Sequence, residues 1–441
     1  MVNTKKGLMK NVLLIVGAGL LFFACATKPD VYLEMDNAVL GGSFADALTV
    51  LEKGQESKKP FYPEKNRILL QLDKGILEHY AEKYDASAND LEEGERLIEE
   101  AFTKSVSQEV TSYIANDNTK DYPGEDYEDI YVNVFNALNY YHRGDLEGAV
   151  VEIRKVNIKL QALADKYAAG GSVIKEFAKK QVESLIMPDE EPVTLTDSAL
   201  ARYIGGLFYR GDNRLDDARI DFEEIEKIYA AAPGIYSSPR PASIDEELNV
   251  PSGMARLNVV AFAGLSPVKQ ENVLSVPIPL PSNAANQAKL ALPQLVIRPS
   301  NITGVRVELQ DGQSFSLDLI EDMESVAIET FKAKYALTFL KTITRVAIKA
   351  IAGEVATQAA EQAGGFGSLV SFGSKLAADA SESADIRLSR YFPGKAYVGG
   401  ITLDPGTYSF TVQFNDGSSK VFENVEVKAG ALNLVEAVCL K

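Results

Sequence analysis

The chain has very few of the residues that disulfide-rich folds and many enzymes depend on. Its 441 residues include two cysteines, two histidines and no tryptophan. Cys25 and Cys439 are too few for a disulfide framework. His79 and His142 belong to no HExxH motif, and CxxC and GxSxG are absent as well. We therefore predict that the protein has no metal site and no cofactor, and that it is not an enzyme.

Positive charge is also scarce. The chain has 45 basic and 62 acidic residues, which gives a net charge of −17. Residues 1–24 contain three lysines and no acid, so without them 42 basic residues face 62 acidic ones and the net charge is −20. Such a surface repels phosphate backbones, and we expect no nucleic-acid partner.

The N-terminus has the pattern of a secretory signal. Three lysines precede the apolar stretch 11–24, which is too short to span a bilayer comfortably. The run Leu21-Phe22-Phe23-Ala24-Cys25 is typical of a bacterial lipobox. We predict that residues 1–24 are a signal peptide, that cleavage falls between Ala24 and Cys25, and that Cys25 is the lipid attachment site. Acyl chains such as palmitate would then hold the protein on a membrane.

This interpretation predicts a lipid-anchored lipoprotein of the cell envelope, associated with the periplasm and the outer membrane; the sequence does not indicate which face of that membrane carries it. Ala26, rather than an acid, follows the lipidated cysteine. In many bacteria with two membranes this favours sorting to the outer membrane. The alternatives are an uncleaved anchor and an ordinary secretory signal followed by a chance cysteine.

Between residue 30 and about residue 233 the apolar periodicity is helical, and one pattern recurs four times. A turn is followed by an aromatic residue or leucine and, three positions later, by a small residue. The turns begin at Gly42, Glu82, Gly144 and Asn213, and the small residues are Ala47, Ser87, Ala149 and Ala218. Turn spacings of 40, 62 and 69 residues exceed the roughly 34 of a tetratricopeptide array. We predict irregular tetratricopeptide-like repeats over 25–233; an ordinary helical bundle is the alternative.

The second half has the pattern of strands. Residues 234–254 are rich in Pro, Ser and Gly and are predicted to be a linker. Residues 255–441 show short alternating segments separated by turn signals such as Asp311-Gly312 and Asp416-Gly417. We predict an antiparallel, sandwich-like β domain with a helical insertion at about 321–383. The fold class is therefore α+β with more than one domain.

Several stretches of the chain resemble an uncharacterised family of bacterial lipoproteins. The similarity is spread over most of the mature chain and includes HYAEKYDASANDLEEGERLIEE, ALARYIGGLFYRGDNRLDDARIDFEEIEKIY, VVAFAGLSPVKQENVLSVPIPLP and ADIRLSRYFPGKAYVGGITLDPGTYSFTV. The resemblance implies tetratricopeptide-like helices joined to a β domain, and attachment to a membrane. It implies no activity.

These features predict a scaffold that is anchored by lipid and binds a protein partner of the envelope through its helical repeats. Tyr127, Tyr131, Tyr140 and Tyr141 are candidate aromatic anchors for the partner, although core packing explains them equally well. Two other functions remain open: hydrolysis of envelope glycan by a pair of carboxylates, and transport of lipid or lipoprotein in an apolar cavity of the β domain.

The insertion also contains a basic amphipathic helix at about 331–363. Phe339, Ile343 and Val346 contribute to its apolar stripe, and Lys341 and Arg345 to a cationic face. Such a helix suits an anionic lipid surface or a partner, or it packs into the protein's own core with its cations toward the acidic helices.

Overall fold

The computed structural model describes residues 31–107, 120–181, 197–279, 285–332 and 383–441, together with six helical residues between 334 and 346. Within this part of the chain the protein is α+β, as the sequence predicts. A helical region comes first, and a seven-stranded sheet with a separate two-stranded ribbon follows.

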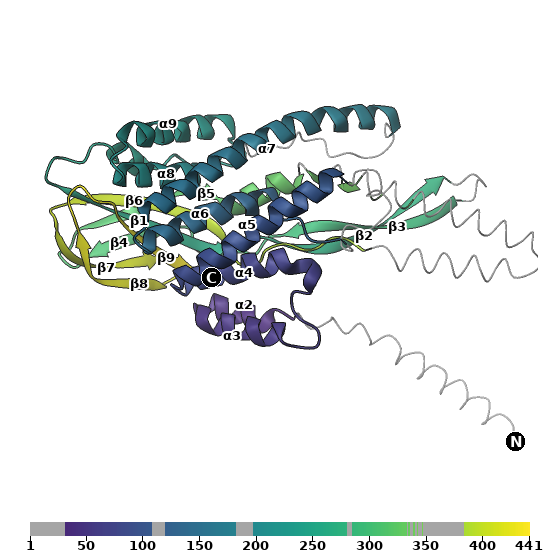
Figure 1. The fold of residues 1–441 in the computed structure, drawn as a ribbon, viewed down its shortest axis with the longest axis horizontal. Coiled ribbons are helices and arrows are strands. Elements are labelled where there is room, and N and C mark those ends of the chain that lie inside the picture. The colour runs from purple at the N-terminus through teal and green to yellow at the C-terminus, as the bar shows by residue number, and fades with distance from the viewer. Residues whose placement is uncertain are drawn as a thin grey trace, which may run out of the picture.

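Among the described residues, the helical region contains eight helices, and each packs on the next along the chain. Figure 1 shows them stacked in order in front of the sheet, from α2 and α3 at one end to α8 and α9 at the other. Their bounds are α2 Leu33–Leu40, α3 Phe44–Gln55, α4 Arg67–Tyr80, α5 Tyr84–Ser107, α6 Asp126–His142, α7 Leu146–Gln181, α8 Ala199–Gly211 and α9 Leu215–Ala231.

The four predicted helix–turn–helix units are confirmed, and their turns share one geometry. Each first turn residue has a positive φ: 74° at Gly42, 59° at Glu82, 79° at Gly144 and 58° at Asn213. Its N–H donates to the carbonyl three residues back, and the next N–H donates to the carbonyl five residues back. This is the Schellman motif, which satisfies the carbonyls at the end of a helix.

The predicted small residues permit the two helices of each unit to approach closely. Ala47, Ser87, Ala149 and Ala218 are all fully buried. Glycine has the same effect on the facing helix: a Cβ added to Gly206 in α8 would lie 2.5 Å from the Phe222 ring in α9. A side chain at this position would therefore require the Phe222 ring or the helix that carries it to shift.

Most of the predicted strands are also confirmed. The strands are β1 Ala255–Leu265, β2 Val268–Pro279, β3 Ala285–Val296, β4 Val305–Leu309, β5 Ser314–Asp322, β6 Pro393–Leu403, β7 Gly406–Phe414, β8 Ser419–Val427 and β9 Asn433–Cys439. The turns at Gly312 and Gly417 have positive φ, as their sequence signals predict.

The prediction of a purely antiparallel sandwich is wrong, because the main sheet is mixed. Its strand order is β8-β7-β4-β5-β6-β1-β9, and β9 lies parallel to β1. The sheet curls until β8 and β9, at opposite ends of this order, contact each other. The other five neighbouring pairs of this order are antiparallel. The inner face is filled by buried side chains that include Leu257, Val307 and Phe410.

The ribbon of β2 and β3 extends away from the main sheet (Figure 1). The predicted helical insertion falls between β5 and β6, and its helical residues begin at 323 rather than at about 321. Tyr335, Phe339 and Val346 from this insertion pack on Leu290 and Leu292 of β3. At these positions the amphipathic stripe is therefore in contact with the protein itself.

The helices and the outer face of the sheet share one hydrophobic core. The Phe135 ring of α6 packs against the Phe262 ring of β1, with their centroids 5.0 Å apart, and Val398 of β6 and Leu434 of β9 belong to the same cluster. The predicted linker contains the short 3-10 helix η3, Ala242–Glu246. Three side chains of the linker, Ile235, Tyr236 and Ile244, also belong to this core. The boundaries 25–233, 234–254 and 255–441 stay a prediction.

Candidate functional site

The face that the helical hairpins turn toward the rest of the chain is the candidate site, and we call it the inner groove. It is formed by the first helix of each hairpin: α2, α4, α6 and α8. Each of these helices contacts either the sheet or the segment 384–392 that precedes β6.

Residues 384–392, the inner segment, cross three helices of the groove without regular secondary structure. Leu388, Ser389, Tyr391 and Phe392 are buried. Phe392 packs against Tyr131 and Phe135 of α6, at ring-centroid distances of 6.2 and 5.9 Å. The groove thus holds an extended piece of polypeptide that belongs to the same chain.

Two buried carboxylates accept hydrogen bonds from backbone N–H groups of this segment. Asp73 Oδ1 accepts hydrogen bonds from Arg390 N at 2.7 Å and Ser389 Oγ at 2.6 Å, and Tyr62 donates to the other oxygen. Glu128 accepts from Ser389 N at 2.7 Å. Burial raises the pKa of Asp73, and burial together with Glu125 raises the pKa of Glu128 to about 7.

The charged side chains of the segment are also held. The Arg390 guanidinium pairs with Asp36 of α2, and the Tyr391 hydroxyl donates to the same carboxylate at 2.8 Å. Arg387 pairs with Asp385 at 2.7 Å and donates to the Lys120 carbonyl.

A third buried carboxylate, Glu321 at the end of β5, joins the sheet to α6 and α8. It accepts hydrogen bonds from the Tyr131 hydroxyl, from Ser198 Oγ at 2.9 Å and from Leu200 N at 3.0 Å, and Tyr236 donates to it at 2.8 Å. Burial raises the pKa of Glu321, although these donors oppose the shift. The carboxylate caps the start of α8, where backbone N–H groups lack helical partners.

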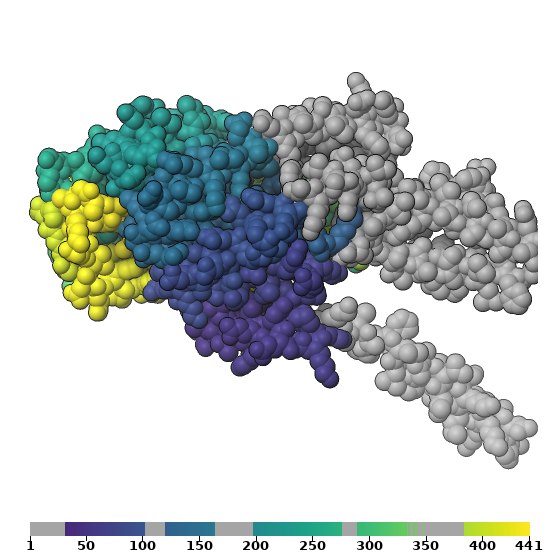
Figure 2. Space-filling model, viewed as in Figure 1, coloured from purple at the N-terminus to yellow at the C-terminus, as the bar shows by residue number. Residues whose placement is uncertain are grey.

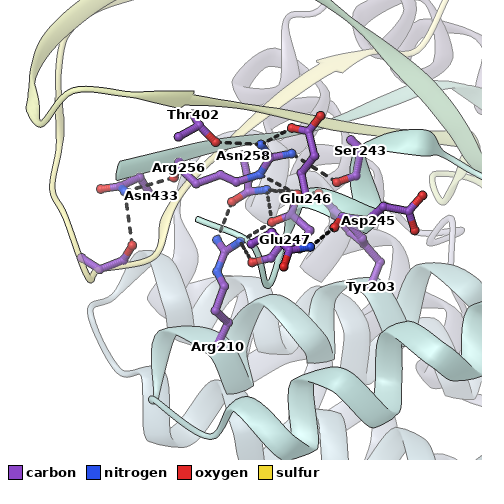
Figure 3. A network of polar contacts seen from close by, with 12 residues as sticks. Tyr203, Arg210, Ser243, Asp245, Glu246, Glu247, Arg256, Asn258, Thr402 and Asn433 are labelled. Atoms are coloured by element: carbon purple, nitrogen blue, oxygen red, sulfur yellow. Dashed lines mark hydrogen bonds and ion pairs between the residues drawn. The ribbon is translucent and has the colours of Figure 1, made fainter. Parts of the chain in front are cut away.

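A fourth carboxylate, Glu247, lies between two arginines at the far end of the groove (Figure 3). Its side chain is fully buried and pairs with Arg210 of α8 and, at 3.0 Å, with Arg256 of β1. Asn258 donates to it at 2.9 Å. Arg256 is itself 2 % exposed, so water does not compete for this ion pair. Since Glu247 directly follows η3, its bonds to α8 and β1 fix η3 between the helices and the sheet.

The two histidines meet at Glu436 of β9. His79 Nε2 lies 3.0 Å from one carboxylate oxygen, and His142 Nε2 contacts the other. Burial alone raises the pKa of Glu436, but the two histidines outweigh burial and lower the pKa below its usual range. The arrangement joins α4 and α6 to the edge of the sheet.

The four candidate tyrosines divide into two pairs. Tyr127 and Tyr131 are 3 % and 0 % exposed, so a partner cannot reach them on the folded surface. Tyr140 and Tyr141 are half-buried; Tyr140 donates to Glu92 at 2.6 Å, and Tyr141 receives a hydrogen bond from Leu434 N at 2.9 Å. Their role in partner binding stays a prediction.

Other predicted features fall partly or wholly outside the described residues. Ala24 and Cys25 lie there, as does most of the basic amphipathic helix 331–363. In the part of the chain that the structure describes, no helix is long and apolar enough to cross a membrane. Nor does any group of histidine, cysteine or carboxylate side chains in that part suit a metal ion.

One surface cleft of about 520 Å³ lies where the predicted linker meets the sheet. Its lining includes Arg240, Asp318, Lys395 and Tyr397. Glu226 and Asp245 already pair with Arg240, and Glu324 interacts with Lys395. The cleft therefore brings together charges of both signs but no nucleophile with an adjacent base.

Comparison with family models, curated proteins and solved structures finds no match to this chain. Sequence reasoning missed the buried carboxylates, since no acid stood out among 62. A signal exists at Asp73, which shares a helical face with Leu69 and Ile76 and thus lies within an apolar stripe.

Proposed function

We propose that the protein is a lipid-anchored scaffold of the bacterial cell envelope that binds a protein partner and has no catalytic role. The tether rests on the signal pattern and Cys25, with the outer membrane as the expected location. The partner-binding part is the set of tetratricopeptide-like hairpins, since arrays of this kind present extended surfaces to polypeptides.

The observation that carries this proposal is the inner segment in the inner groove. The hairpins receive an extended polypeptide by its backbone N–H groups, its arginines and its aromatic side chains. The ability of the hairpins to hold an extended polypeptide favours a protein-binding function over an enzymatic one. The buried carboxylates that a hydrolase would need are instead bonded to the chain's own donors at Asp73, Glu128 and Glu321.

Because the chain itself fills the inner groove, we assign partner binding to the outer face of the hairpins. Figure 2 shows the helical region as a broad surface with the C-terminal strands at one end. On α7, Ile158 is 70 % exposed and Val151 is 44 % exposed, one heptad apart on the same side of the helix. Exposed apolar side chains on a rigid helix are suitable anchors for a partner.

A pull-down of the tethered protein after cross-linking on membranes tests this proposal. Val151→Ser and Ile158→Ser should reduce recovery of the main cross-linked partner severalfold without lowering the melting temperature. The matched control is Val421→Ser on β8, where an apolar side chain that is 58 % exposed lies on another face. Equal recovery from all three variants would contradict the assignment to α7, and glycan hydrolysis by the pure protein would contradict the scaffold.

A further inference from the structure

The outer face of α2, the first described helix of the stack, exposes large apolar side chains. Leu33 is 59 % exposed and Leu40 is 39 % exposed, and Val31, just before the helix, is 56 % exposed. In arrays of helical repeats the terminal unit usually presents a polar outer face to water. We therefore treat Val31, Leu33 and Leu40 as a candidate contact surface and call them the α2 patch.

The helix places the two leucines on one line. Leu33 and Leu40 are seven residues apart, which is close to two full turns. Met35 and Val39, on the opposite side of α2, are fully buried in the core. Asn37, which is polar but uncharged, lies between the leucines on the exposed side. The exposed stripe itself thus carries no charge.

Contacts with other elements hold the start of α2 in place. The Tyr32 hydroxyl donates to the Phe61 carbonyl at 3.2 Å, and the centroids of the Tyr32 and Phe61 rings are 5.7 Å apart. The Arg390 guanidinium lies over the Tyr32 ring, 4.4 Å from its centroid. Val31 and Leu33, on either side of Tyr32, are therefore presented outward by a fixed backbone.

The predicted lipid attachment site lies close to this patch in the chain. Val31 follows Cys25 by six residues. Even a fully extended chain of that length reaches at most about 22 Å, so a lipid on Cys25 keeps the start of α2 beside the membrane surface. Figure 1 shows α2 and α3 at one end of the helical stack, and this end is then the one nearest the bilayer.

The charges near the start of α2 do not oppose contact with lipid. The exposed charged side chains of α2 and of the end of α3 with the loop that follows it are three acids and three lysines: Glu34, Glu52, Glu56, Lys53, Lys58 and Lys59. These charges balance, whereas the whole chain has a net charge of −17. The long lysine side chains can also reach lipid phosphates.

We propose that the α2 patch rests on the lipid bilayer and inserts Val31, Leu33 and Leu40 at the boundary between headgroups and acyl chains. Moving these side chains out of water is favourable. Because the lipid on Cys25 already holds the chain at the surface, the patch binds at a high effective concentration. The contact fixes the orientation of the stack on the membrane and directs the later hairpins away from it. This inference rests on the lipid anchor of the proposed function.

A fluorescent probe on the lipidated full chain in phospholipid vesicles tests the contact. In a Cys439→Ser background, where the lipid blocks Cys25, Leu33→Cys and Leu40→Cys each accept a polarity-sensitive fluorophore. Lipids with a spin label on the acyl chain quench probes that enter the bilayer. We expect severalfold stronger quenching of both probes than of one on Ile220→Cys in α9, a side chain that is 51 % exposed near the other end of the stack.

A matched pair of double variants separates the patch from the tether. In Leu33→Ser with Leu40→Ser, a probe on Val31→Cys should lose most of its quenching. The melting temperature should change by no more than about 1 °C, because both leucines are exposed. The control is Leu215→Ser with Ile220→Ser on α9, which should leave the quenching of the Val31→Cys probe unchanged.

Three outcomes would overturn the proposal, and they differ in what else they contradict. Protein that does not associate with vesicles at all contradicts the lipid anchor as well as the patch. Protein that is bound to vesicles but has unquenched probes contradicts the patch alone. Probes on the leucines whose emission shifts to the blue without quenching by lipid would show that a protein covers the patch instead.

Discussion

Asp73 Oδ1 in α4 lies 2.7 Å from the backbone nitrogen of Arg390, a residue 317 positions later in the chain. The contact is one of several in which a buried carboxylate takes donors from a distant element. Glu321 does so for α6 and α8, and Glu436 does so for α4 and α6. Each bond is shielded from water, so leaving the carboxylate without its donors would be costly. These carboxylates therefore couple the helices to the sheet.

We first predict that the helices and the sheet unfold together. The shared core and the buried carboxylates both break when either half unfolds. Far-ultraviolet circular dichroism, which is dominated by helix, and the fluorescence of a tryptophan introduced by Tyr397→Trp in β6 should therefore give one midpoint in a denaturant titration. The chain has no tryptophan of its own, so this fluorescence reports on the sheet. Asp73→Ala should lower that midpoint for both signals, by about 2–4 kcal/mol in unfolding free energy.

The matched control for Asp73→Ala is Glu423→Gln, on the exposed surface of β8. It should change the unfolding free energy by no more than about 0.5 kcal/mol. Two separate transitions would contradict the single unit and would support the division into 25–233 and 255–441, with protease cleavage in the linker 234–254.

The second prediction compares two adjacent glutamates that bind the same arginine. Arg256 pairs with Glu247 at 3.0 Å and with Glu246 at 2.7 Å, but the Glu247 side chain is 0 % exposed and that of Glu246 is 66 % exposed. Glu247→Ala leaves Arg256 and Arg210 buried without their shared carboxylate, so we expect a loss of about 3–5 kcal/mol. Glu246→Ala should cost about 1 kcal/mol or less, because solvent screens its ion pair.

Equilibrium unfolding in urea measures both variants, and the difference between them is the informative quantity. Similar small losses would mean that water enters the network around Glu247 and screens it. The double variant Glu246→Ala with Glu247→Ala then separates the two effects. Because both glutamates bind Arg256, the loss in the double variant should differ from the sum of the two single losses by at least about 0.5 kcal/mol.

The third prediction concerns acid. Since the two histidines lower the pKa of Glu436 in the folded protein, folding favours its ionised form. The stability that this carboxylate contributes is present above the pKa of the unfolded state, about 4.3, and is lost as the pH falls toward the lower folded value. At pH 7 Glu436→Gln should therefore be less stable than the wild type, and the difference should shrink below about pH 4.

Melting temperatures at half-unit steps from pH 7 to pH 3 provide the measurement for Glu436. Glu426→Gln, with an exposed carboxylate on β8, is the control and should follow the wild-type profile. If the difference in melting temperature between wild type and Glu436→Gln stays constant over this range, the negative charge of Glu436 does not stabilise the contact of α4 and α6 with β9.

Sequence reasoning found the local features of this fold and missed the distant ones. The turns at Gly42 and Gly144 were predictable because a Schellman motif depends on a few consecutive residues. The parallel pairing of β9 with β1 was not predictable, because it brings together residues such as Leu257 and Asn433 that are far apart in the chain. The role of Glu321 was hidden for a related reason, since its donors lie up to 190 residues away.

The candidate site shows the same limit. Tyr127 and Tyr131 were chosen as surface anchors because aromatic residues at helical spacing suit either a core or an interface. Burial decides between these roles, and burial here depends on the inner segment, which arrives from beyond the predicted insertion. The half-buried Tyr140 and Tyr141 are the two for which the surface role is still open.

The last prediction concerns the tether. Cys25 is the only thiol near the predicted cleavage site, because Cys439 is the only other cysteine and is buried in the sheet. Metabolic labelling with a fatty-acid analogue should therefore mark the wild type, whereas Cys25→Ser should carry no label and should appear as the precursor or in the soluble fraction. Cys439→Ser is the matched control and should be labelled like the wild type. Equal labelling of wild type and Cys25→Ser would contradict lipidation at Cys25. It would also contradict the proposal that a lipid at this residue holds the scaffold on the membrane.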